Sequence, residues 1–62
     1  MNIQVGDLFK RNINDTLAIV TDVQYDEETE QYLIQFNRIN NSFNDPLIFS
    51  VVDFLDYYDP VG

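Results

Sequence analysis

Cysteine and histidine are both absent from the 62 residues, and only three side chains are Lys or Arg. Without cysteine, the fold has no disulfide to stabilise it and no thiolate metal site. Without histidine, it lacks the side chain that most often acts as a general base. The shortage of cations argues against direct nucleic-acid binding, because Lys and Arg neutralise phosphates. We expect a protein that is not an enzyme, uses no cofactor and does not contact nucleic acid directly.

Long apolar runs are also absent, and no stretch reaches the length needed to span a bilayer. The opening residues 1–4 show neither a basic region nor an apolar run of the kind found in secretory signals. We therefore expect a cytoplasmic protein that has no membrane partner.

Carboxylates, by contrast, are abundant: eleven Asp and Glu residues give a formal net charge of -8. In a small domain they repel one another, because the electrostatic screening length is about 8 Å at physiological salt. We predict that moderate salt or mild acid raises the thermal unfolding midpoint, since both weaken this repulsion. Unfolding followed by circular dichroism at increasing NaCl measures the effect, and a midpoint that falls would contradict it.

Apolar residues are plentiful enough to build a core. They make up 45% of the chain and include four Tyr and five Phe. A domain of this size buries roughly 60% of the surface of its unfolded chain, so its stability is small. We predict a single domain over residues 1–62 that is held together by aliphatic and aromatic packing alone.

Alternation of apolar and polar residues with period two predicts strands along most of the chain. The clearest strand is 17–25, and residues 26–30 form a polar tip whose length suits a hairpin. There Asp26 is expected to accept hydrogen bonds from the backbone two or three residues on. Other strands are predicted at 8–11, 32–39 and 47–51, with a polar loop at 40–45. One face of the clearest strand carries Leu17, Ile19, Thr21, Val23 and Tyr25.

The C-terminal segment allows two structures. In the first, Ser50 caps a short helix whose third residue is Asp53. In the second, a single 3₁₀ turn is followed by a short closing strand at 56–58. Pro60 ends either element, since proline supplies no backbone N–H. We expect one helical turn near 51–55.

Short strands separated by turns predict an all-β domain of four or five strands. The segments Val5–Phe9, Ala18–Val23 and Gln31–Phe36 resemble SH3-like small barrels of the KOW and Tudor kind, over roughly residues 5–58. The resemblance implies a small SH3-like barrel, or a bent antiparallel sheet, with one short helical turn near the C-terminus. It does not imply RNA binding, because RNA-binding KOW modules tend to be basic and usually carry Gly where this chain has Ala18. The predicted core is Leu8, Leu17, Ile19, Val23, Ile34, Phe36, Leu47, Phe49 and Phe54.

The acidic surface is the main functional candidate. Carboxylates on a rigid domain can imitate the phosphates of duplex DNA and occupy the positive groove of a basic protein. This predicts a non-enzymatic protein-binding module, and more specifically an acidic inhibitor of a basic nucleic-acid-binding protein of the kind that phages and mobile elements use. The alternative is that the acidity only keeps the protein soluble. The residues predicted to contact the partner are Asp22, Asp26, Glu27, Glu28, Glu30, Asp53, Asp56 and Asp59.

Exposed aromatics give a second candidate, an adaptor or accessory subunit that recognises a peptide or protein. Tyr57 and Tyr58 are its predicted contacts; as neighbours on a strand they point to opposite faces, so one of them is exposed. Tyr25 and Tyr32 are instead expected to fill the core.

Three further hypotheses follow from the same residues. The carboxylates of the polar tip are interpreted as a solvated turn and not as catalytic groups, because a tip offers no pocket. Their spacing differs from that of an EF-hand loop, so no dedicated metal site is expected. A homodimer is left open, because Ala18 and Val20 need cover on the second face of their strand.

Overall fold

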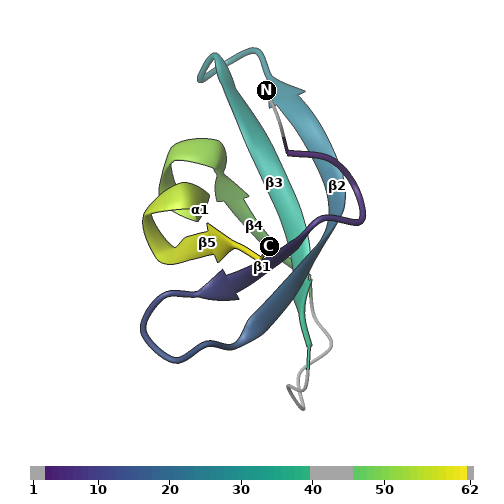
Figure 1. Ribbon diagram of the computed structural model, residues 1–62. Coiled ribbons are helices and arrows are strands. Elements are labelled where there is room, and N and C mark those ends of the chain that lie inside the picture. Colours follow the sequence, from purple (N-terminus) through teal and green to yellow (C-terminus); the bar gives the residue numbers. More distant parts are fainter. Residues whose placement is uncertain (1–2, 40–45, 62) are drawn as a thin grey trace.

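The computed structural model describes residues 3–39 and 46–61, which form one open antiparallel sheet of five strands and one short helix (Figure 1). This confirms the predicted all-β class with a helical segment near the C-terminus. The loop predicted at 40–45 lies outside the described residues. The elements are β1 (Leu8–Arg11), β2 (Leu17–Asp26), β3 (Gln31–Arg38), β4 (Leu47–Ser50), α1 (Val51–Tyr57) and β5 (Tyr58–Pro60).

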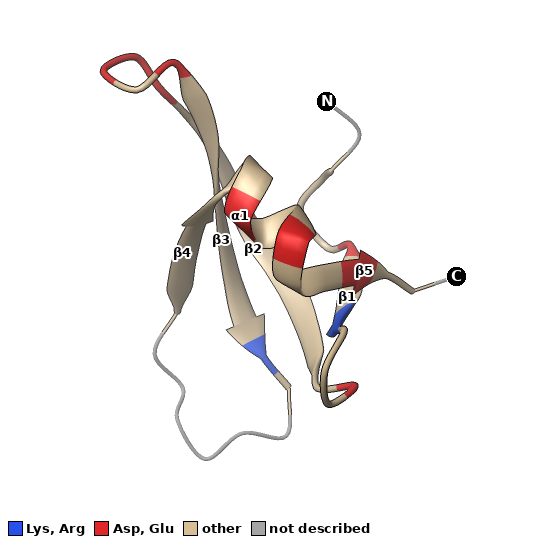
Figure 2. Cartoon of the chain, turned by 90° about the vertical axis from the view of Figure 1, so that its left-hand side faces the viewer, with Lys and Arg blue, Asp and Glu red and all other residues tan. Residues whose placement is uncertain are grey.

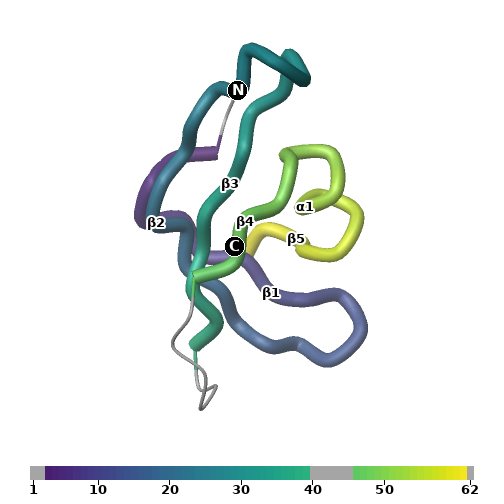
Figure 3. Tube along the Cα trace, turned by 180° about the vertical axis from the view of Figure 1, so that it is seen from behind, coloured from purple at the N-terminus to yellow at the C-terminus, as the bar shows by residue number. Residues whose placement is uncertain are grey.

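The strands follow the order β4-β3-β2-β1-β5 across the sheet, and every neighbouring pair is antiparallel. The first four strands form a meander, and α1 carries the chain back so that β5 pairs with β1. The β2–β3 hairpin is the longest part of the sheet, and its tip extends beyond α1 at one end (Figures 1 and 3).

A β-bulge interrupts β2 and decides which of its side chains face the core. Val20 pairs with Phe36, whereas Asp22 pairs with Gln35, so Thr21 is the extra residue on β2. One extra residue exchanges the two faces of a strand, because its side chains alternate. Val20 and Val23 consequently lie on the same face, although an unbroken period of two places them on opposite faces.

The predicted faces of β1 and of the first half of β2 are therefore wrong. Leu8 is 42% exposed, whereas its neighbour Phe9 is 5% exposed and lies opposite the buried Ala18. Leu17 and Ile19 are only half-buried, on the outer face. Phe9 replaces Leu8 in the core because an aromatic ring opposite a small alanine has room to reach the helix.

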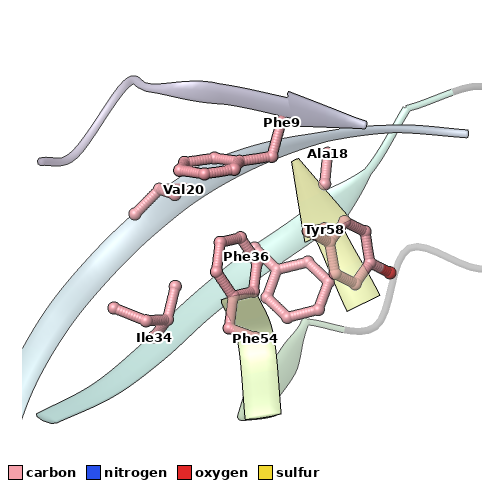
Figure 4. Close-up of a cluster of buried hydrophobic side chains, with 7 residues drawn as sticks. All are labelled: Phe9, Ala18, Val20, Ile34, Phe36, Phe54 and Tyr58. Atoms are coloured by element: carbon pink, nitrogen blue, oxygen red, sulfur yellow. The ribbon is translucent and has the colours of Figure 1, made fainter. Parts of the chain in front are cut away.

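The core is an aromatic cluster between the sheet and α1 (Figure 4). Phe36 lies 5.0 Å from both Phe54 and Tyr58, measured between ring centroids, and Phe54 stacks on Tyr58 with an interplanar angle of 8°. Phe9 meets Phe54 edge-on at 4.8 Å. Of the predicted core, Ile34, Phe36 and Phe54 are buried, while Val23, Leu47 and Phe49 pack against them.

Helix α1 begins as predicted. Ser50 has extended backbone, and the Asp53 backbone N–H donates to Ser50 Oγ over 3.3 Å. Such a cap stabilises a helix by about 1 kcal/mol, and the Asp53 carboxylate suits the positive end of the helix dipole. The helix runs for seven residues and ends at Tyr57, and the backbone of the following Tyr58 is extended. The helical alternative is therefore confirmed, and it extends past the predicted 51–55. A closing strand also follows, but at Tyr58–Pro60 and not at the predicted 56–58, because residues 56 and 57 belong to the helix.

The turn between β1 and β2 holds the end of α1 in place. The Asn12 backbone N–H donates to the Tyr57 carbonyl and the Asn12 side-chain amide donates to the Asp56 carbonyl, each over 2.9 Å. These bonds satisfy carbonyls that a helix C-terminus leaves without an internal partner. They fix α1 over the face of the sheet that carries the core.

Candidate functional site

The tip of the β2–β3 hairpin is an ordered acidic turn. The Glu28 backbone N–H donates to one Asp26 carboxylate oxygen over 3.1 Å, and the Thr29 hydroxyl donates to the other over 2.9 Å. This confirms the predicted role of Asp26 and holds the turn in one shape. Glu30 closes the turn with a left-handed φ of 56°. The side chains of Glu27, Glu28 and Glu30 are all exposed, so the turn presents them to solvent.

Asp22 stands apart from this tip, and its carboxylate serves the strand that carries it. One oxygen accepts from the Val23 backbone N–H over 2.9 Å, and the other accepts from the Gln24 side-chain amide over 2.6 Å. Both bonds lie next to the bulge, where the strand ladder is disturbed. Asp22 was predicted to contact the partner, but both of its carboxylate oxygens are used within β2, where they stabilise the bulge.

The remaining predicted carboxylates, Asp53, Asp56 and Asp59, are exposed on α1 and β5. Figure 2 shows them as a second group, away from the carboxylates of the hairpin tip. The structure therefore divides the predicted acidic set into two surfaces. We call the tip group, formed by Glu27, Glu28 and Glu30, the acidic tip.

The three cations lie at the end of the sheet opposite the acidic tip. Lys10 and Arg11 are on β1 beside the start of β2, and Arg38 is the last residue of β3 (Figure 2). Lys10 is the direct cross-strand partner of Asp59, one of the carboxylates of the second group. No Lys or Arg is close to the acidic tip in sequence or in strand register. The negative potential of the acidic tip is therefore less neutralised than that of the second group on α1 and β5.

Tyr25 and Tyr32 form a cross-strand pair just before the tip, and the prediction that they fill the core is wrong. They are 53% and 41% exposed, and their rings meet edge-to-face at 5.1 Å. The hairpin extends past α1 toward its tip (Figure 1), and the two rings lie on this outer part of it. The signal in the sequence was their position beside the polar tip, where a sheet of short strands is not covered.

Of the other tyrosine pair, one neighbour faces solvent as predicted, although Tyr57 ends α1 and only Tyr58 lies on a strand. Tyr57 is 50% exposed and Tyr58 is 2% exposed, so one of the two neighbours faces solvent. Tyr57 lies edge-on to Phe49 at 6.2 Å. Because Tyr58 is part of the aromatic core, only Tyr57 of this pair offers a surface to a partner.

Within residues 3–39 and 46–61, no three carboxylates lie close enough to hold a metal ion. Helix α1 is too short to cross a membrane. Comparison of the chain with family models, with curated proteins and with solved structures finds no match.

Proposed function

We propose that this protein is a non-enzymatic protein-binding module that inhibits a basic nucleic-acid-binding protein by occupying its positive groove. One observation carries the proposal: an ordered turn presents Glu27, Glu28 and Glu30 to solvent, at the end of the molecule remote from all three cations. A partner that recognises closely spaced phosphates, at about one charge per 1.7 Å of duplex axis, also attracts closely spaced carboxylates.

The segregation of charge matters for how fast the two proteins meet. A molecule with a formal net charge of -8 and a bare negative end is drawn to a positive groove in a preferred orientation. Electrostatic complementarity of this kind raises the association rate and is lost as salt increases. A fast association rate helps an inhibitor that competes with nucleic acid for the same groove.

For the fold we propose a relationship to SH3-like small barrels of the KOW and Tudor kind, with the sheet open between its edge strands β4 and β5. The strand order β4-β3-β2-β1-β5 and the short helix between the last two strands support this. Such a compact module in the cytoplasm, encoded by a phage or mobile element, suits an inhibitor that needs no catalytic residues.

The adaptor and the homodimer have less support than the inhibitor. The adaptor alternative retains Tyr57 as its exposed contact, because Tyr58 is in the core. The argument for a homodimer required a cover for Ala18 and Val20, and both are buried inside a single copy of the chain. The acidic inhibitor therefore remains the preferred function.

The proposal is tested by affinity capture from a cell lysate at low salt, elution with a salt gradient and identification by mass spectrometry. We expect a DNA- or RNA-handling protein that elutes only at high salt. The purified pair is then challenged with duplex DNA, which should displace the inhibitor as its concentration rises. A partner that resists salt and ignores the duplex would contradict the proposal and favour the adaptor.

A further inference from the structure

The pair formed by Tyr25 and Tyr32 is the continuation of the core-facing side of the hairpin. Along that side, Phe36 lies opposite Val20 and Ile34 opposite Val23, with the tyrosines as the next pair toward the tip. The first pair is fully buried under the aromatic cluster, and Ile34 of the second pair is buried too. The tyrosine pair is the first on this side to emerge into solvent.

The reason is the length of the neighbouring strand. Strand β4 pairs with β3 only as far as Ser50, which lies opposite Leu33, and the chain then turns into α1 at Val51. No strand therefore flanks Tyr32 on that side of β3 in the described structure. The rings of Tyr25 and Tyr32 are thus exposed between the buried core and the acidic tip. We call this pair the tyrosine ledge.

Ring geometry leaves part of the ledge uncovered by the pair itself. The two planes meet at 68°, so one ring points its edge at the face of the other. In such a pair, the ring that contributes its edge keeps both of its faces clear of the partner ring. The face of an aromatic ring carries negative potential, which attracts a cation placed above it.

Charge complementarity decides what occupies the ledge. Asp26 directly follows Tyr25, and the exposed Glu27, Glu28 and Glu30 lie within the same turn. An anionic occupant is repelled there, and so is a second copy of this chain, since each copy has a formal net charge of -8. A guanidinium suits both features, because its plane stacks on aromatic faces and its positive charge is attracted by the carboxylates.

We propose that the tyrosine ledge anchors an arginine side chain of a basic partner protein, while the acidic tip neutralises its charge. This deepens the proposed function and rests on it. The ring faces of Tyr25 and Tyr32 favour arginine over lysine. The carboxylates of the acidic tip attract both cations equally. The two contributions are separable by substitution.

The test is a titration of the labelled protein with two peptides of equal charge, Gly-Arg-Gly-Arg-Gly-Arg and Gly-Lys-Gly-Lys-Gly-Lys, followed by NMR. We expect the arginine peptide to bind at least about threefold more tightly, as cation–π contacts at exposed sites allow, and to shift the Tyr25 and Tyr32 ring signals. The Tyr25→Leu, Tyr32→Leu double variant should lose that preference. The Tyr25→Phe, Tyr32→Phe variant should keep it, because phenylalanine retains the ring face.

Two more variants separate the ledge from general attraction. Ile48→Thr removes a comparably exposed apolar side chain on β4 and should bind both peptides like the wild type. Replacing Glu27, Glu28 and Glu30 with Gln should weaken both peptides equally. Amide spectra of every variant confirm that it is folded.

Equal affinity of the wild type for the two peptides overturns the arginine anchor, as does a leucine variant that keeps the preference. Either result leaves the proposed inhibitor function untouched, because attraction by the acidic tip does not need the ledge. That function is tested separately, by displacement with duplex DNA. Loss of duplex displacement with a normal peptide preference would instead overturn the inhibitor function and leave the anchor intact.

Discussion

Replacing Phe36 with alanine is expected to unfold most of the protein at room temperature. Phe36 is completely buried on a central strand and contacts the rings of Phe49, Phe54 and Tyr58. Removing a buried phenylalanine side chain costs about 3–5 kcal/mol, because it leaves a cavity as well as losing apolar burial. At roughly 0.05–0.15 kcal/mol per residue, a domain of 62 residues has a stability of similar size.

Urea unfolding followed by circular dichroism measures this loss. The matched control is Leu8→Ala, which truncates a large apolar residue on the outer face of β1. Because Leu8 is largely exposed, its removal should cost only about 1 kcal/mol. If Leu8→Ala is as damaging as Phe36→Ala, the core does not lie on the face of the sheet that α1 covers.

Reversing the charge of the acidic tip should have the largest effect on partner binding. In the Glu27→Lys, Glu28→Lys, Glu30→Lys variant, we expect the association rate with the captured partner to fall on the order of 10- to 100-fold. Its dependence on salt should also flatten, since fewer ion pairs form in the complex. Stopped-flow or surface-based kinetics at several NaCl concentrations gives both quantities.

The control for location is the triple Asp53→Lys, Asp56→Lys, Asp59→Lys, which alters the net charge by the same amount on the second acidic surface. If α1 and β5 do not face the partner, this triple should reduce the rate less than the tip triple. Equal losses would mean that net charge alone steers association. A larger loss for the helix triple would move the binding surface from the hairpin to α1 and β5.

Local features of this fold follow directly from short stretches of sequence. The acidic turn depends on Asp26 and its own next three residues, and the start of α1 depends on Ser50 and Asp53. Period-two alternation placed β1 to β4 within a residue or so of where they lie, but not β5. Such features need no information from the rest of the chain, because their hydrogen bonds close within a few residues.

The candidate binding surface was predicted only in part, because some of its features are local and others depend on tertiary contacts. The acidic character of the tip is a property of composition and turn position, and both are visible in the chain. The division of the carboxylates into two surfaces is not, because it depends on how the hairpin and α1 are placed relative to each other. The role of Asp22 at the bulge likewise appears only once β2 and β3 are paired.

What the sequence determined by itself is an acidic, all-β domain with a capped helical segment and an ordered turn at Asp26. The tertiary structure decided which faces are buried. The bulge at Thr21 exchanged the two sides of β2, Phe9 displaced Leu8 from the core, and the tyrosine ledge emerged where β4 ends. A strand with apolar residues on both faces gains similar free energy from burying either, so the choice falls to register and to the reach of α1.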